Sequence, residues 1–201
     1  MDGMPSAQRL ILGSRVGFFL GRFAALAAAF ALPGCGQNTA SRGQEKDVNN
    51  SSSDLLTVGT PAPDFSVVAH DGQRIQLSQL KNQYVVLYFY PHDDTPGCTK
   101  EACEFRDAWD KLQQAGVAVF GVSTQDTSSH QAFAQKYNLP FPLLPDQDGA
   151  IAAKYHVRVF LGFTKRVTYL IGKDGRIAYV WPSVKPVGHA ADILTHIPQQ
   201  G

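Results

Sequence analysis

The sequence has few of the features that mark nucleic-acid-binding, zinc-binding or membrane-spanning proteins. Its 18 Lys and Arg residues nearly balance its 17 Asp and Glu residues, for a formal net charge of +1, so nothing indicates a nucleic-acid partner. The three cysteines lack the second closely spaced Cys/His pair of a zinc site, so no metal is expected. The apolar run at 23–32 is too short to span a membrane comfortably.

Cys98 and Cys103 lie where a strand is expected to meet a helix. Residues 84–90 are β-branched and aromatic, which predicts a buried strand that Pro91 ends. Apolar residues then recur at helical spacing, which predicts one helix that continues up to Gly116. The cysteines therefore occupy a strand-to-helix junction, a layout typical of reactive thiols.

The start of this helix favours the anionic form of Cys98. Thr95 is suited to the N-cap, Pro96 to the first helical position and Cys98 to the third. Backbone N–H groups there have no acceptor within the helix, and together with the helix dipole they stabilise a thiolate. Gly97 has no side chain, so a substrate can approach the sulfur closely. A core cysteine does not require this context, and we expect Cys98 to be functional.

Cys103 is the natural partner of Cys98, but an intact helix keeps the two sulfurs apart. Five residues rise roughly 7.5 Å and leave the two Cα atoms about 8–9 Å apart, whereas a disulfide needs ~4.4–6.8 Å. A bond between them therefore predicts a segment that is helical when reduced and locally unfolded when oxidised. The alternative for Cys103, a small buried hydrophobic residue, is equally open at this point.

Pro91, Thr95 and Cys98 form the motif Pro-x-x-x-Thr-x-x-Cys, in which the chain resembles the peroxiredoxins. The form Thr-Pro-Gly-Cys-x-x-x-x-Cys is similar to the bacterioferritin comigratory protein (PrxQ) branch, in which both cysteines belong to one chain. The likeness extends from about Val58 to Ile197. It includes Gly59-x-Pro-Ala-Pro-Asp-Phe65 near the start and Arg166-Val-Thr-Tyr-Leu-Ile171 near the end.

The resemblance implies a role for each matching residue. Cys98 is then the peroxidatic cysteine and Cys103 the resolving cysteine, and the two form an intramolecular disulfide. Thr95 orients the peroxide through its hydroxyl, and Pro91 shields the sulfur from water. Arg166 matches an arginine that holds the thiolate and the peroxide oxygen. The implied protein is a monomeric thiol-dependent peroxidase that reduces hydrogen peroxide and organic hydroperoxides and needs no cofactor. A thioredoxin-like dithiol protein recycles it.

Two departures from the family pattern stand out. Asp93 and Asp94 lie between Pro91 and Thr95, where acidic groups oppose ionisation of a nearby thiol unless they point to solvent. Gly172 replaces the acidic residue that usually precedes Lys-Asp-Gly, a change that we interpret as confined to a turn.

The N-terminus is predicted to be a targeting segment. Three arginines precede the apolar run, and Leu-Pro-Gly-Cys follows it, so residues 1–34 resemble a lipoprotein signal peptide whose lipobox ends at Cys35. Cys35 would then be lipidated, although a plain secretory signal or an uncleaved anchor is the alternative. Residues 35–54 are expected to be a disordered tether and 55–201 the peroxiredoxin domain. This organisation predicts a lipid-anchored protein of the bacterial cell envelope, facing the periplasm or exterior.

The order of predicted elements indicates a thioredoxin-like α/β fold with a central mixed sheet flanked by helices. Strands are expected at 65–68, 74–77, 84–90, 117–123, 141–144, 167–171 and 176–180, and further helices at 128–137, 149–155 and 188–197. The histidines other than His92 are expected to be solvated or capping residues, namely His70, His130, His156, His189 and His196.

Two other functions fit a thioredoxin-like fold. A Sco-type copper-delivery or thiol-disulfide exchange protein would have three residues between its cysteines, whereas four separate Cys98 from Cys103. A surface lipoprotein that keeps the fold only as an interaction module would not need the full set of Pro91, Thr95, Cys98 and Arg166. Both are therefore less favoured than a peroxidase.

Overall fold

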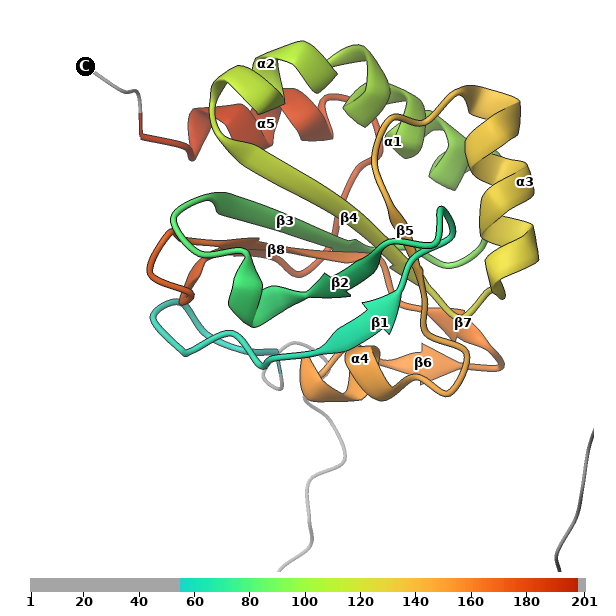
Figure 1. Ribbon diagram of the computed structural model, residues 1–201, viewed down its shortest axis with the longest axis horizontal. Coiled ribbons are helices and arrows are strands. Elements are labelled where there is room, and N and C mark those ends of the chain that lie inside the picture. The colour runs from blue at the N-terminus through green and yellow to red at the C-terminus, as the bar shows by residue number, and fades with distance from the viewer. Residues whose placement is uncertain (1–54, 199–201) are drawn as a thin grey trace, which may run out of the picture. The chain divides into compact units, whose positions relative to one another are not determined.

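The computed structural model describes residues 55–198, which form an α/β fold with helices on both faces of a mixed sheet (Figure 1). This architecture confirms the predicted fold class. The predicted signal peptide (1–34), the lipidation site Cys35 and the tether up to residue 54 lie outside the described residues.

The strands are β1 (Ser66–Val68), β2 (Arg74–Gln76), β3 (Tyr84–Phe89), β4 (Val117–Ser123), β5 (Leu143–Pro145), β6 (Val159–Phe160), β7 (Phe163–Thr164), β8 (Val167–Ile171) and β9 (Ile177–Trp181). Five of them form the central sheet, in the order β5-β4-β3-β8-β9. β3 pairs in parallel with β4 and antiparallel with β8, which makes the sheet mixed. The hairpins β1-β2 and β6-β7 lie outside it.

The helices are η1 (Leu77–Gln79), α1 (Pro96–Asp107), α2 (Trp109–Gln114), α3 (Thr127–Tyr137), α4 (Ala150–Lys154) and α5 (His189–Thr195). Buried side chains of α1, α2, α3 and α5 contribute to one hydrophobic core. Those of α4 and of the β1-β2 hairpin contribute to a second core. The sheet thus separates two hydrophobic layers.

β3 shows why this sheet is buried on both faces. Its side chains alternate, so Val86 and Tyr88 join the core beneath α1, whereas Val85 and Leu87 join the core beneath α4. A strand with two buried faces needs a nearly continuous apolar sequence, which is what residues 84–90 provide. The end of this strand positions the chain at the start of α1.

The expected single helix up to Gly116 is wrong. Helical geometry is interrupted at Ala108 (φ −93°, ψ 3°), which separates α1 from α2. In α2, Leu112 is completely buried and the Trp109 ring lies 5.9 Å from that of Phe141. Gly116 still ends the second helix, with the positive φ of 69° that favours glycine.

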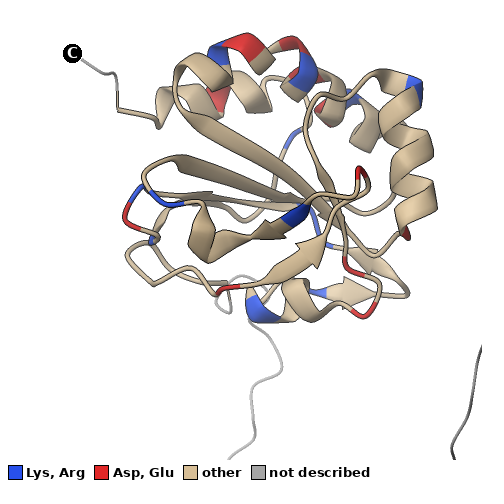
Figure 2. Cartoon of the chain, in the orientation of Figure 1, with Lys and Arg blue, Asp and Glu red and all other residues tan. Residues whose placement is uncertain are grey.

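Charged residues of both signs lie interspersed on the helices at the top of the view in Figure 2. Within residues 55–198, no helix combines the length and the apolar character needed to cross a membrane. The same range holds no group of three or more His, Cys, Asp or Glu side chains able to bind a metal ion.

Candidate active site

Cys98 lies at the third position of α1, directly after the loop that follows β3. Its side chain is buried, with 1% of its surface exposed. Thr95 is the N-cap and Pro96 the first helical residue, as predicted, and the first helical hydrogen bond runs from the Thr99 N–H to the Thr95 carbonyl at 2.8 Å. The N–H groups of Gly97 and Cys98 precede this bond, so they lie at the open, electropositive end of the helix.

Arg166 contacts the sulfur across a sequence gap of 68 residues. Its Nη2 donates to Cys98 Sγ at 3.1 Å. The antiparallel register of β3 and β8 explains the proximity. Phe89, the last residue of β3, lies opposite Val167, the first residue of β8. Arg166, which precedes Val167, therefore lies at the end of the sheet from which the chain continues to Cys98. A cation therefore lies within hydrogen-bonding distance of Cys98, where it stabilises a thiolate.

Glu101 is a site residue that sequence analysis missed. Its side chain is fully buried one turn after Cys98, and Oε2 accepts a hydrogen bond from Arg166 Nη1. Burial raises the pKa of the Glu101 carboxyl to about 7, although Arg166 acts in the opposite direction. The three-residue spacing from Cys98, which places two helical side chains on the same face, is the signal that could have identified it.

Thr95 and Pro91 lie in the loop between β3 and α1, and both are half-buried. The Thr95 hydroxyl does not cap the helix. It donates instead to the His92 carbonyl at 3.2 Å. The structure thus brings Arg166 into contact with Cys98, while Pro91 and Thr95 come from the segment immediately before it. Gly97 also borders this region, since a Cβ there would lie 3.4 Å from Arg166 Nη2.

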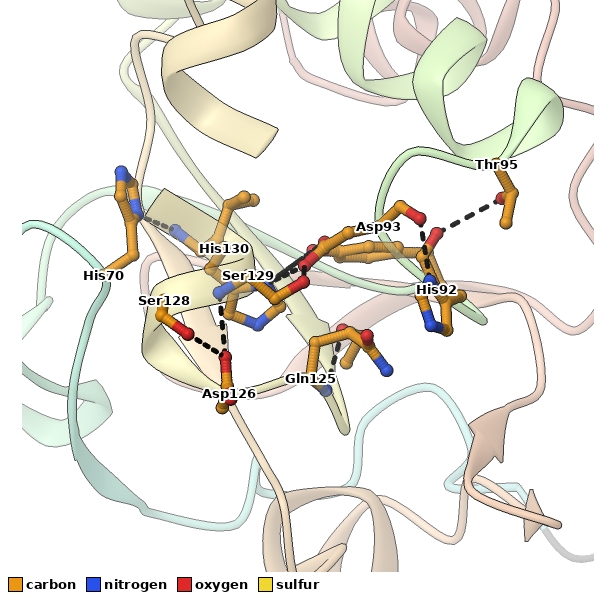
Figure 3. A network of polar contacts seen from close by, with 12 residues as sticks. His70, His92, Asp93, Thr95, Gln125, Asp126, Ser128, Ser129 and His130 are labelled. Atoms are coloured by element: carbon orange, nitrogen blue, oxygen red, sulfur yellow. Dashed lines mark hydrogen bonds and ion pairs between the residues drawn. The ribbon is translucent and has the colours of Figure 1, made fainter. Parts of the chain in front are cut away.

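The two acidic residues of the loop point in different directions. Asp93 is buried and accepts hydrogen bonds from Tyr90, Ser129 and His130 (Figure 3). Burial raises the pKa of its carboxyl, but these hydrogen bonds outweigh burial and leave the pKa below its ordinary value. Asp94 is exposed and binds the side chains of α3 at its C-terminal end.

The expectation that the histidines are solvated is wrong for His130 and His189. His130 is completely buried because its ring pairs with Asp93, a long-range contact that leaves no pattern in sequence. His189 is buried against Phe105, with its Nε2 3.0 Å from Thr168 Oγ1. Burial lowers the pKa of His189 to about 4, so this ring is neutral at neutral pH.

Cys103 lies on α1 and is half-buried, and both Cys98 and Cys103 are free thiols in a continuous helix. Arg106 lies close to Cys103 in the next turn, where the two side chains interact. Its Nη1 donates to the Tyr137 carbonyl at the end of α3, at 2.8 Å. This segment of α1 is therefore tied to the end of α3.

Exposed apolar side chains flank the site. The β6-β7 hairpin, which sequence analysis did not predict, exposes Phe160, Leu161 and Phe163. The Phe163 ring lies 5.8 Å from that of His92, and Thr164 donates through its hydroxyl to the carbonyl at the end of the β3 segment. An apolar rim thus lies beside the loop that precedes Cys98.

Comparisons with known proteins agree with this geometry. Residues 58–180 match the AhpC/TSA family. The chain belongs to the AhpC/TSA family. This peroxiredoxin is 47% identical over 147 residues to the bcp protein of Coxiella burnetii, an alignment that covers 69% of this chain and 97% of the relative. It is 38% identical to Peroxiredoxin Bcp of Bacillus subtilis, over 69% of this chain and 93% of the relative.

Solved structures extend the likeness to three dimensions. The crystal structure of Peroxidoxin BcpB from Mycobacterium tuberculosis superposes with a TM-score of 0.66 and 34% identity, over 71% of this chain and 96% of that one. Peroxiredoxin Q of Xanthomonas campestris gives 0.64 and 30%, over 72% and 97%. This peroxiredoxin therefore belongs to the Bcp/PrxQ branch, and it is a thiol-dependent peroxidase.

Proposed function

We propose that this peroxiredoxin reduces hydrogen peroxide and organic hydroperoxides with Cys98 as the peroxidatic and Cys103 as the resolving cysteine. The observation that carries the proposal is the 3.1 Å contact between Arg166 Nη2 and Cys98 Sγ at the open end of α1. A helix N-terminus and a guanidinium together stabilise the thiolate, which is the nucleophilic form of cysteine.

The oxygen transfer consumes one thiolate and one hydroperoxide. Cys98 sulfur attacks the terminal peroxide oxygen, the O–O bond breaks, and the departing oxygen takes a proton to leave as water or an alcohol. Cys98 becomes a sulfenic acid. Arg166 and the free N–H groups supply positive charge where the leaving oxygen develops negative charge, and the Thr95 hydroxyl orients the peroxide. Pro91 keeps water from the sulfur.

The resolving step joins two residues of one helix. Cys103 sulfur attacks the Cys98 sulfenic acid, an S–S bond forms, and the oxygen leaves as water. Both cysteines lie in the continuous helix α1, so the first turns must unwind before the sulfurs can meet. A thioredoxin-like dithiol protein then reduces the disulfide by two exchange steps and returns the enzyme to its helical, reduced form.

A peroxide titration followed by mass spectrometry tests these roles. The wild-type domain should lose two hydrogens per molecule, and proteolytic peptides should contain a Cys98–Cys103 link. The Cys103→Ser variant should stop at an oxygen adduct on Cys98, and Cys98→Ser should consume no peroxide. Retained peroxidase activity in Cys98→Ser would refute the assignment.

Hydrogen exchange tests the unwinding. Amides from Thr99 to Arg106 should be protected in the reduced protein and should exchange much faster in the disulfide form. The matched reference is α3, whose protection should be the same in both redox states. Equal protection of Thr99–Arg106 before and after oxidation would contradict a resolving step that requires unwinding.

We further propose that the protein is exported as a lipoprotein anchored through Cys35 to a membrane of the bacterial cell envelope, and acts there as a monomer. The support is the sequence of residues 1–35 alone, in which arginines and a short apolar run precede Leu-Pro-Gly-Cys. Metabolic labelling with a fatty acid should mark the wild-type protein in the membrane fraction. Cys35→Ala should remove the label, and labelling that persists in this variant would reject the assignment.

A further inference from the structure

The loop between β3 and α1 carries two of the proposed active-site residues, Pro91 and Thr95, on six residues without regular structure. Two internal hydrogen bonds shape it. Thr95 Oγ1 donates to the His92 carbonyl at 3.2 Å, and His92 Nδ1 lies 2.7 Å from the Asp93 carbonyl. These contacts join neighbouring residues only, so something else must fix the loop relative to the rest of the fold.

Asp93 provides the buried connection, because its carboxylate binds side chains of α3 (Figure 3), whereas Asp94 contacts the same helix in an exposed position. Oδ2 accepts from Ser129 Oγ at 2.6 Å and lies 2.9 Å from His130 Nδ1. Oδ1 accepts from Tyr90 Oη at 2.7 Å. A carboxylate can only accept, so His130 must carry a proton on Nδ1. Asp93 is 5% exposed and His130 is 0% exposed. Removing either partner would leave the other buried without its hydrogen bond, which is destabilising.

His130 Nδ1 also lies 3.2 Å from Tyr90 Oη and 3.1 Å from Asp93 Oδ1, whereas its buried Nε2 has no partner among the described residues. The polar contacts of this ring are therefore gathered at Nδ1, which faces Asp93 and Tyr90. The helix start that carries His130 is fixed separately. Asp126 caps α3 by accepting from the Ser129 N–H at 2.8 Å, and the His130 N–H donates to the Asp126 carbonyl at 3.1 Å. The backbone of Ser129 and His130 is thus held by the start of α3, and their side chains can fix the position of the loop through Asp93.

We propose that Asp93 and His130 are positioning residues for the oxygen-transfer step. From α3 they hold the loop so that Pro91 and the Thr95 hydroxyl stay in register with Cys98, a role that rests on the proposed function of those three residues. Arg166, which directly precedes β8, and the start of α1 reach Cys98 through separate contacts. The pair should therefore affect reaction with a peroxide, which needs Thr95, much more than reaction with a simple alkylating agent.

Two neighbouring carboxylates allow a matched test. In a Cys103→Ser background, which isolates oxygen transfer to Cys98, we compare Asp93→Asn with Asp94→Asn. Asp94 is exposed and lies on the same loop with contacts to the same helix, and asparagine tolerates its positive φ of 55°. Asp93→Asn should lower the rate constant for H2O2 roughly 10–100-fold, because a displaced catalytic group costs about that much. Asp94→Asn should leave it within about twofold, since surface changes have small effects.

The readout is the ratio of two rate constants for Cys98, one for H2O2 and one for iodoacetamide, each followed by mass spectrometry. Only the peroxide rate should fall in Asp93→Asn. Parallel loss of both rates would show a general structural defect and overturn the proposal, as would a wild-type peroxide rate. If the Cys103→Ser parent itself ignores H2O2, the proposed role of Cys98 fails instead, which is a different result.

A second pair of variants tests the donor on His130. Asparagine can place its amide nitrogen near the position of Nδ1, whereas glutamine places it near that of Nε2. His130→Asn should therefore recover a larger share of the peroxide rate than His130→Gln, at a similar iodoacetamide rate. Equal loss in both variants would refute the requirement for a donor to Asp93. Tyr90→Phe, which removes one hydrogen bond and keeps the ring, should lower the peroxide rate less than Asp93→Asn does.

Discussion

Glu101 should make this peroxiredoxin less stable as the pH rises through the neutral range. Its side chain is fully buried beside Arg166, and its Oε1 has no partner among the described residues. Burial raises the pKa of the carboxyl from 4.5 to about 7, against the opposing effect of Arg166. The folded protein therefore holds a proton between these pH values that the unfolded chain has released, and the free energy of unfolding falls as the pH rises.

The size of the effect follows from the two pKa values. A change from 4.5 to about 7 corresponds to about 3 kcal/mol of stability, present in full below the unfolded pKa and lost once the pH exceeds the folded pKa. Most of this loss, about 2–3 kcal/mol, falls between about pH 5 and about pH 8. Glu101→Gln has nearly the same shape but no proton to lose, so its stability should lack this component.

Urea unfolding of the reduced protein at several pH values provides the assay. The quantity to compare is the wild-type stability minus that of Glu101→Gln, which should fall by about 2–3 kcal/mol from about pH 5 to about pH 8. His189 has the opposite effect in an overlapping range, since its lowered pKa adds stability as the pH rises from about 4. That contribution is present in both proteins and cancels. A flat or rising difference would refute the reasoning and show that the attraction of Arg166 outweighs burial.

Three further substitutions test other contacts. Arg166→Lys should lower the rate of Cys98 oxidation by H2O2 roughly 10–100-fold, because an ammonium cannot reproduce the two-sided hydrogen bonding of a guanidinium, and a wild-type rate in stopped flow would contradict this. Gly121→Ala would place a Cβ 2.7 Å from the ring of Tyr88 and should cost about 1–3 kcal/mol in urea unfolding, whereas unchanged stability would show that the ring can move. Asp146→Ala removes the acceptor for two backbone N–H groups of α4, both at 2.8 Å, and should cost about 1–3 kcal/mol; a thermal midpoint equal to that of the wild type would contradict the capping role.

The sheet could be predicted from sequence because its strands are short apolar runs with clear ends. β4 and β8 have the predicted bounds, and β3 differs by one residue. The break between α1 and α2 was not predictable, since Ala108 is a good helix former and the apolar spacing continues past it. The direction of α2 depends on how Leu112 and Trp109 pack against the core, which is a tertiary effect.

The site likewise has features that local sequence predicts and features that depend on tertiary contacts. Thr95, Pro96 and Cys98 are neighbours in sequence, so their order alone predicted a helix start. The position of Arg166 required the pairing of β3 with β8, and it came from the family resemblance. The bond between Asp93 and His130 spans 37 residues, and an Asp and a His that meet in the interior look in sequence like two surface residues. Buried polar pairs of this kind therefore escaped prediction.

The interruption at Ala108 limits how far along the chain the unwinding that we propose for the resolving step can extend. α2 is a separate helix that begins at Trp109, and its Leu112 packs in the hydrophobic core. A single helix up to Gln114 would pass the unwinding of its first turns on to the core residue Leu112. Because α1 and α2 are separate helices, the unwinding that we propose for α1 can stop at Ala108 and leave α2 packed.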